Sequence, residues 1–318
     1  MKIDTHNHAL PQAVQDLVSA DDRFGVTIED GYVKRANYAD HKLYPELHDT
    51  GAKLAQLEGR GLEGAVICIE PSLFSYHLDL ELGEAIAEAA NRGLRTMAEE
   101  SDGRFRWLAH VPLQDPERAG EVLESAVADG AVGVEIGSSI VGRRLDEPDF
   151  APFWHAVEKT GVTVFAHNAY NAKIPGLESY YLGNVIGNLL ETTICVERLI
   201  ASGTLDRHPN ARILLAHAGG FFPYQAGRLR HAQTVRPELA ASPGDPWDYA
   251  GQLIFDTITH DVRTLTYLVS RAGADNIVMG TDMPYDMSTP EPMRELVDAV
   301  GEEVATQIAE TNPERYFS

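Results

Sequence analysis

The sequence contains very little cysteine. Only Cys68 and Cys195 occur among 318 residues, and neither has a second cysteine at the spacing of a metal site. Two isolated thiols exclude a disulfide-stapled scaffold. Cys68 lies in a strand-like apolar run and Cys195 in a helix-like one, so we expect both to be small buried hydrophobic residues.

Positive charge is also scarce, with 26 Lys and Arg against 48 Asp and Glu, a formal net charge of −22. Such a surface repels phosphate backbones, so we expect no nucleic-acid partner, and an anionic ligand would need a locally basic pocket. Long apolar runs are missing too, which predicts no membrane span. Asp4, His6 and His8 interrupt the N-terminus where a signal peptide needs apolar residues, so we expect a cytoplasmic protein.

What the sequence does contain is an alternation of strand-like and helix-like segments. Eight apolar, Val- and Ile-rich runs are predicted strands: Lys2–His8, Gly64–Ile69, Phe105–Val111, Val132–Gly137, Val162–Asn168, Arg212–His217, Leu253–Thr259 and Asn276–Asp282. The predicted helices are Leu80–Glu100, Pro116–Asp129, Asp149–Thr160, Val185–Ser202, Tyr224–Thr234, Val262–Ala272 and Met293–Ala299. Eight alternating units favour a single (β/α)8 TIM-barrel domain over residues 1–318.

Two segments interrupt this alternation. Residues 11–54 separate the first strand from its helix, and we interpret them as an insertion, a small sheet or a lid. Residues 168–184 form a second long loop, after the fifth strand. Both follow strands, so both are expected at the C-terminal face of the barrel, where barrel enzymes hold their active sites.

The strongest chemical signal is the H-x-H pair of His6 and His8 in the first strand. Residues i and i+2 of a strand point to the same face, so both imidazoles project into the barrel and can bind one divalent ion. The alternative is a pair of buried histidines without a ligand.

Other strands end on residues of the same kind: His167 on the fifth, His217 on the sixth and Asp282 on the eighth. Three imidazoles, or two with a carboxylate, beside an open position form the pattern of a catalytic zinc site. These strand ends therefore favour the metal interpretation of the H-x-H pair.

At these residues the chain resembles a known family. The matching segments are Ile3-Asp4-Thr5-His6-Asn7-His8, Glu191-Thr192-Thr193, His217-Ala218-Gly219-Gly220, Arg236-Pro237-Glu238-Leu239 and Gly280-Thr281-Asp282-Met283-Pro284. They resemble the amidohydrolase-superfamily branch that contains 2-amino-3-carboxymuconate 6-semialdehyde decarboxylase, and the resemblance covers nearly the whole length.

The resemblance implies a single zinc ion, with manganese as the alternative, held by His6, His8, His167 and Asp282. It makes His217 the acid/base, catalytic together with Asp282. The expected reaction is decarboxylation of a small unsaturated or aromatic carboxylic acid. Because no lysine ends the fourth strand, where Val134-Glu135-Ile136-Gly137 stands, a binuclear site with a carboxylated lysine is disfavoured.

The resemblance also assigns two arginines to the substrate. Arg35 matches an arginine of the inserted segment, and Arg236 matches one that reaches into the neighbouring subunit's site, which implies a homodimer. Planar guanidinium groups bind carboxylates through two hydrogen bonds. The competing interpretation for both is a solvated surface arginine.

The chain departs from the decarboxylase pattern at two places. Asn168-Ala169 follows His167 where the decarboxylase has Pro-Trp, and Asp286 adds negative charge near the pocket. These departures keep open a hydrolase or hydratase that uses the same metal. A catalytically silent binding protein is the other alternative, but it should have broken ligand positions. His260 and, less directly, His110 are expected to support the site from behind its ligands.

Overall fold

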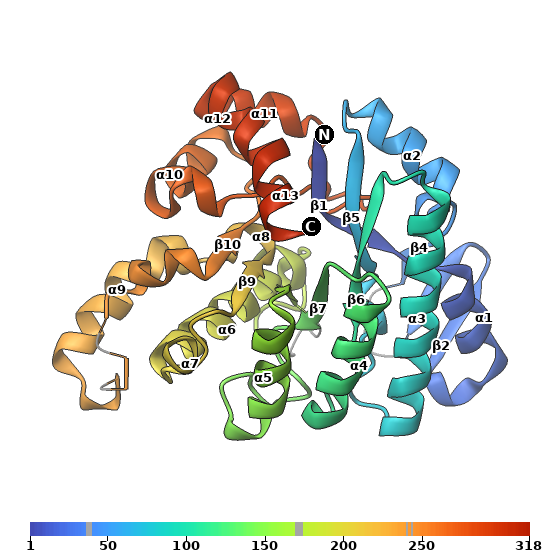
Figure 1. Cartoon of the computed structure of the whole chain (residues 1–318), viewed down its shortest axis with the longest axis horizontal. Coiled ribbons are helices and arrows are strands. Elements are labelled where there is room, and N and C mark those ends of the chain that lie inside the picture. The colour runs from blue at the N-terminus through green and yellow to red at the C-terminus, as the bar shows by residue number, and fades with distance from the viewer. Residues whose placement is uncertain (36–39, 169–173, 240, 243) are drawn as a thin grey trace.

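A curled, seven-stranded parallel sheet forms the centre of the protein (Figure 1). The computed structural model describes residues 1–35, 40–168, 174–239, 241–242 and 244–318. The strands follow one another around the sheet in chain order: β1 (Ile3–Ala9), β5 (Gly64–Ile69), β6 (Phe105–His110), β7 (Gly133–Gly137), β8 (Thr163–His167), β9 (Arg212–Leu215) and β10 (Leu253–Phe255). This mixed α/β architecture, with a curled parallel sheet, is consistent with the TIM-barrel-like fold predicted from the sequence.

The predicted eighth strand is not a regular one. Its segment forms single bridges, from Ile277 to Phe255 in β10 and from Met283 to Asn7 in β1. Within it, side chains replace neighbouring backbone as hydrogen-bond acceptors: the Gly280 N–H donates to Thr257 Oγ1, and the Thr281 N–H donates to Asp4 Oδ1. The segment therefore lies between the first and last strands, as expected, but without a continuous ladder.

Helices cover the outside of the sheet (Figure 1). Their bounds are α1 (Gln12–Ala20), α2 (Thr50–Gly59), α3 (Leu80–Glu100), α4 (Pro116–Ala128), α5 (Ala151–Thr160), α6 (Leu189–Ala201), α7 (Thr204–Arg207), α8 (Ala216–Gly219), α9 (Phe222–Val235), α10 (Val262–Ala272), α11 (Pro292–Val300), α12 (Glu302–Thr306) and α13 (Asn312–Tyr316). The predicted bounds of α3 and α10 agree with these. Both helices begin after an aspartate, Asp79 or Asp261, whose side chain accepts a hydrogen bond from the first turn.

The segment between β1 and β5 contains more regular structure than its sequence pattern indicated. It holds α1, α2 and a separate antiparallel sheet of β2 (Val26–Glu29), β3 (Tyr32–Arg35) and β4 (His41–Lys42). The small sheet agrees with one of the two forms expected for this segment. The helices α12 and α13 near the C-terminus were not predicted.

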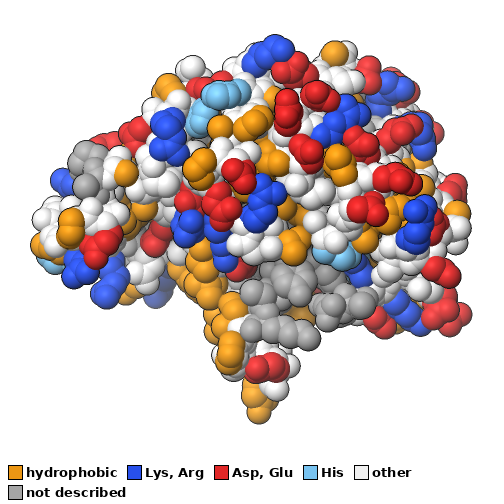
Figure 2. Space-filling view, turned by 90° about the horizontal axis from the view of Figure 1, so that it is seen from below, with side chains coloured by type: hydrophobic (Ala, Val, Ile, Leu, Met, Phe, Trp, Pro, Cys, Tyr) orange, Lys and Arg blue, Asp and Glu red, His pale blue; other side chains and the backbone are white. Residues whose placement is uncertain are grey.

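The second long loop is described only in part, because residues 169–173 lie outside the described part of the chain. Its described remainder exposes large apolar side chains, with Tyr180 at 90% and Tyr181 at 58% exposure. Figure 2 shows hydrophobic side chains gathered on a projection of the surface.

No helix among the described residues has the length and apolar character that a membrane span requires. Cys68 and Cys195 are both buried and free, as expected.

Candidate metal centre

The first strand places His6 and His8 inside the sheet. Every side chain of β1 is buried, and the two histidines lie on the same side because strand residues alternate. Their Nε2 atoms are 3.1 Å apart. Both rings are completely buried, and their Nε2 atoms are close enough to bind one common metal ion.

His167 and Asp282 complete a four-residue cluster with this pair. Asp282 Oδ1 is 3.1 Å from His8 Nε2 and 3.5 Å from His6 Nε2. The His167 ring lies 5.1 Å from that of His6 and 5.0 Å from that of His8. One ligand atom from each of the four residues lies within 4.8 Å of all the others. The structure therefore brings together the four residues proposed as ligands, from β1, the end of β8 and the segment after β10.

The donor set fits a divalent metal ion. His167 Nε2 is buried and has no hydrogen-bond partner among the described residues, while its Nδ1 lies 2.9 Å from the Asn168 carbonyl oxygen. A buried nitrogen without a partner is costly unless another group binds it. Three imidazole nitrogens and one carboxylate suit zinc and also manganese or iron.

The electrostatics favour neutral imidazoles at His8 and His167 and an ionised carboxylate at Asp282, the forms that bind metal. At His6 burial opposes the charged form, but the hydrogen bond to Asp256 and the charges of Asp282 and Asp256 outweigh it and raise the pKa of this ring. Burial, reinforced by the neighbouring imidazoles, holds the pKa of His167 well below its usual value, and burial also lowers the pKa of His8. Burial opposes the charged form of Asp282, but hydrogen bonds from His217 and His8 outweigh it and hold its pKa well below the usual range.

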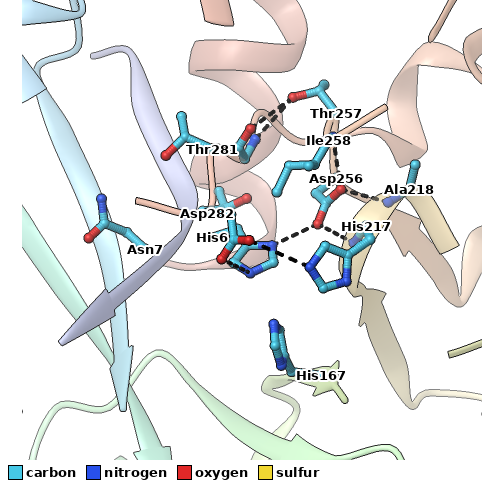
Figure 3. A network of polar contacts seen from close by, with 12 residues as sticks. His6, Asn7, His167, His217, Ala218, Asp256, Thr257, Ile258, Thr281 and Asp282 are labelled. Carbon is cyan, nitrogen blue, oxygen red and sulfur yellow. Dashed lines mark hydrogen bonds and ion pairs between the residues drawn. The ribbon is translucent and has the colours of Figure 1, made fainter. Parts of the chain in front are cut away.

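Asp256, just after β10, organises the site from behind, and the sequence analysis did not single it out (Figure 3). Its carboxylate lies 2.8 Å from His6 Nδ1. It also accepts hydrogen bonds from the backbone N–H groups of His217, Ala218 and Ile258 at 2.7–3.0 Å. Burial opposes its charge, yet its pKa is lowered, because His6 and these N–H groups stabilise the carboxylate. With Nδ1 bound to Asp256, His6 keeps Nε2 free for a ligand.

His217 stands beside the cluster, its Nε2 3.7 Å from Asp282 Oδ2. Its backbone is left-handed, with φ 53°, where the chain leaves β9 and enters α8. The glycines that follow allow this turn, because a Cβ on Gly220 would lie 2.2 Å from the Leu189 carbonyl oxygen. The predicted strand through His217 therefore ends two residues early, and the turn directs the ring toward Asp282.

A cavity of about 560 Å³ opens above the cluster. His8, His167, His217 and Asp282 form part of its lining. Further out, the described lining carries one lysine, Lys42, and four carboxylates: Asp40, Glu70, Glu178 and Asp286. The outer wall is therefore acidic.

The two predicted substrate arginines are not part of this described lining. Arg35 is buried in β3, and its guanidinium group donates to Ser75 Oγ at 3.2 Å and lies 3.2 Å from His77 Nδ1. Arg236 is exposed just after α9 and forms an ion pair of 2.8 Å with Glu238.

The two histidines expected to support the ligands have different surroundings. His260 is exposed and lines a cavity that His217 and Asp282 also line, but Asp256 is the group that holds His6. His110 is buried and stacked on Phe74, with ring centroids 5.4 Å apart. The signal for Asp256 was its position at the end of a buried strand, β10, because His167 likewise stands at the end of β8.

A metal-binding cluster at the C-terminal ends of a curled parallel sheet, with a histidine poised beside it, defines the class of protein. The amidohydrolase family model matches residues 3–318, so the chain belongs to the amidohydrolase family. The chain is 28% identical to the 2-amino-3-carboxymuconate-6-semialdehyde decarboxylase of Dictyostelium discoideum over 323 residues, covering 99% of this chain and 88% of the relative. The predicted resemblance is thereby confirmed.

Two further relatives are also decarboxylases. A γ-resorcylate decarboxylase of a Rhizobium species is 28% identical over 325 residues, covering 96% of this chain and 98% of its own. The 5-carboxyvanillate decarboxylase of Novosphingobium aromaticivorans, solved with manganese and 4-hydroxy-3-methoxy-5-nitrobenzoic acid, superposes with a TM-score of 0.83 at 21% identity. That superposition covers 100% of this chain and 96% of the other, and it supports the fold.

Proposed function

We propose that this protein is a metal-dependent carboxy-lyase that removes carbon dioxide from a small aromatic or unsaturated carboxylic acid. The observation that carries the proposal is the cluster of His6, His8, His167 and Asp282 on the floor of a cavity, with His217 beside it. The two curated relatives described above are decarboxylases.

The four clustered residues would hold one divalent ion, zinc or manganese, which when bound supplies a Lewis acid for a substrate oxygen. His217 carries the proton. When the bond between the ring or chain carbon and the carboxyl group breaks, its electron pair remains on that carbon and takes a proton from His217 Nε2. Asp256 holds the backbone of His217 and so fixes the point from which the proton is delivered.

The acidic outer wall of the cavity supports a substrate with a single carboxylate. Four carboxylates against one lysine in the described lining repel a second negative charge on the ligand, whereas the metal attracts the first. The described lining by itself therefore favours a monoanion, and a second carboxylate on the substrate would need an arginine from outside this lining.

We further propose that Arg236 acts in the cavity of a second copy of the chain, in a homodimer, and that Arg35 binds substrate within its own subunit. Arg236 follows α9, an exposed helix that displays Tyr224 at 83% exposure. Its exposure supports a role outside its own subunit. We also retain the prediction of one (β/α)8-barrel domain, with residues 11–54 inserted at its mouth, in the cytoplasm.

The test is metal content together with carbon dioxide release. Purified wild-type protein should contain about one equivalent of a divalent ion, and the His6→Ala, His8→Ala and Asp282→Ala variants should lose it. The loaded wild-type protein should then release carbon dioxide from a hydroxybenzoate or a carboxylated diene. Hydration or hydrolysis of these compounds without carbon dioxide would favour the hydratase alternative, and a protein that binds no divalent ion would contradict the proposal.

A further inference from the structure

Glu135 in β7 is a buried carboxyl group with no evident structural role. Its side chain is completely buried, and in the described part of the chain its carboxyl group has no hydrogen-bond partner beyond a weak interaction with the Cys68 thiol. Other buried carboxylates are well bonded: Asp256 accepts from His6 and three N–H groups, and Glu191 pairs with Arg144 at 3.0 Å. A buried carboxyl group without such partners costs stability, so packing does not account for it.

The position of Glu135 points to His8. Its Oε1 lies 3.9 Å from His8 Nδ1, on the side of the ring away from the ligand cluster. Cys68 Sγ lies 3.5 Å from the same nitrogen, since Cys68 is the register partner of His8 in β5. When His8 binds a metal ion through Nε2, its proton must reside on Nδ1, and that N–H needs an acceptor.

We propose that Glu135 and Cys68 are positioning residues that hold the Nδ1 side of His8 and so keep its Nε2 directed at the metal ion. Together they do for His8 what Asp256 does for His6. The inference rests on the metal site of the proposed function, but not on the identity of the reaction. By this inference Glu135 positions a metal ligand, while its buried carboxyl group lowers the free energy of unfolding.

The experiment measures metal affinity and stability separately in two variants. Glu135→Leu removes both oxygens and should weaken binding of zinc or manganese, by competition with a chromophoric chelator, about 10- to 100-fold. The melting temperature of the metal-free variant should be equal to or above that of the wild type, because an apolar residue replaces an unpaired carboxyl group. Glu135→Gln retains an oxygen acceptor and should stay within about threefold of the wild type. Cys195→Ala, another buried position, should leave affinity unchanged.

Three results would overturn this proposal. The first is wild-type affinity in Glu135→Leu. The second is lost affinity accompanied by an equal loss of melting temperature in the metal-free protein, which would make Glu135 structural. The third is evidence that His8, Cys68 and Glu135 bind a metal ion of their own, because their ligand atoms lie within 4.8 Å of one another. Two equivalents of metal per chain, with one lost in Cys68→Ala, would establish that site instead.

The outcomes also separate this inference from the proposed function. A wild-type protein that binds no divalent ion would contradict both. A wild-type protein that binds metal and decarboxylates its substrate, with unchanged affinity in Glu135→Leu, would contradict the inference alone. Reduced affinity in Glu135→Leu without any decarboxylation by the wild type would support the inference and contradict only the proposed reaction.

Discussion

The buried side chains at the base of the cavity, here called the floor, and the side chains of its outer lining are held in place differently. On the floor, the side chains of His6, His8 and Asp256 are buried, and 2.8–3.1 Å contacts fix their rings and carboxylates. In the outer lining, Asp286 is exposed. Arg236 lies outside the described lining, and its ion-pair partner among the described residues is Glu238, two positions further along the chain. The proposed metal ligands thus lie on strands or in the segment after β10, whereas Asp286 and Arg236 lie in connecting segments.

Asp256→Asn should have the largest effect on both metal affinity and stability. An amide nitrogen in place of Oδ2 would face His6 Nδ1 and the His217 N–H, and one in place of Oδ1 would face the N–H groups of Ala218 and Ile258, all of which are donors. We expect metal affinity to fall about 10- to 100-fold and the free energy of unfolding to fall by about 3 kcal/mol.

Chelator competition and urea denaturation measure the two effects of Asp256→Asn. The matched control is Asp261→Asn, five residues further on, which changes the helix cap of α10. It should cost about 1 kcal/mol of stability at most and leave metal affinity intact. Equal metal affinity in the two variants would mean that Asp256 does not position the ligands.

The buried His110 should make the free energy of unfolding depend on pH. Burial lowers the pKa of its imidazole from 6.5 to about 4, so below pH 6.5 the unfolded chain binds this proton more readily than the folded one. Its contribution is complete above pH 6.5 and is lost as the pH falls toward 4, at most about 3 kcal/mol. His110→Phe, which retains a ring against Phe74, should flatten the pH profile of unfolding by this amount. Parallel wild-type and variant profiles would contradict the buried neutral imidazole.

Arg236→Ala tests the proposed contact between this arginine and the substrate carboxylate. Loss of one charge-assisted contact to the substrate carboxylate should raise KM about tenfold and leave the metal content unchanged. Arg35→Ala should act similarly within one subunit. Arg294→Ala, an exposed arginine paired with Glu291 on α11, is the control and should have no effect.

Coexpression of Arg236→Ala with His217→Ala distinguishes a shared site from a separate one. If Arg236 serves the neighbouring subunit, half of the sites in a mixed dimer combine two intact residues, and about a quarter of the wild-type activity at low substrate should return. Activity no higher than the sum of the separate variants would restrict Arg236 to its own subunit.

Asp286→Asn should have the smallest effect. Removing one exposed carboxylate from the cavity lining weakens the repulsion of an anionic substrate, so KM should fall about twofold at low salt. The difference should shrink at high ionic strength. An increase of KM would indicate instead that Asp286 binds a donor group of the substrate.

The same division decides what the sequence could predict. The ligand positions were accessible because strand periodicity places His6 and His8 together and parallel strands end at one edge, beside His167 and Asp282. Whether these residues bind metal is still a prediction, but their proximity follows from the pattern. The bounds of α3 and α10 were accessible because aspartate caps begin them.

Other features had no readable local signal. α2 was missed because Lys53, whose ammonium group is buried against Asn7 and the His8 carbonyl oxygen, occupies a position where a helix pattern requires an apolar residue. The eighth strand was predicted as regular, although the N–H groups of Gly280 and Thr281 donate to side chains distant in sequence and interrupt its backbone hydrogen bonds to β10 and β1. The supporting roles of Asp256 and Glu135 depend on contacts across the sheet that no spacing within one strand indicates.

One carboxylate, Asp256, binds both the side chain of a proposed ligand, His6, and the backbone of the proposed acid/base, His217. A displacement of the chain after β10 should therefore move His6 and His217 together, so that their positions relative to each other are kept. Directed evolution toward a new acid should consequently accumulate its successful changes in the loops around the cavity. It should leave the strand ends untouched, even when the library varies all positions equally.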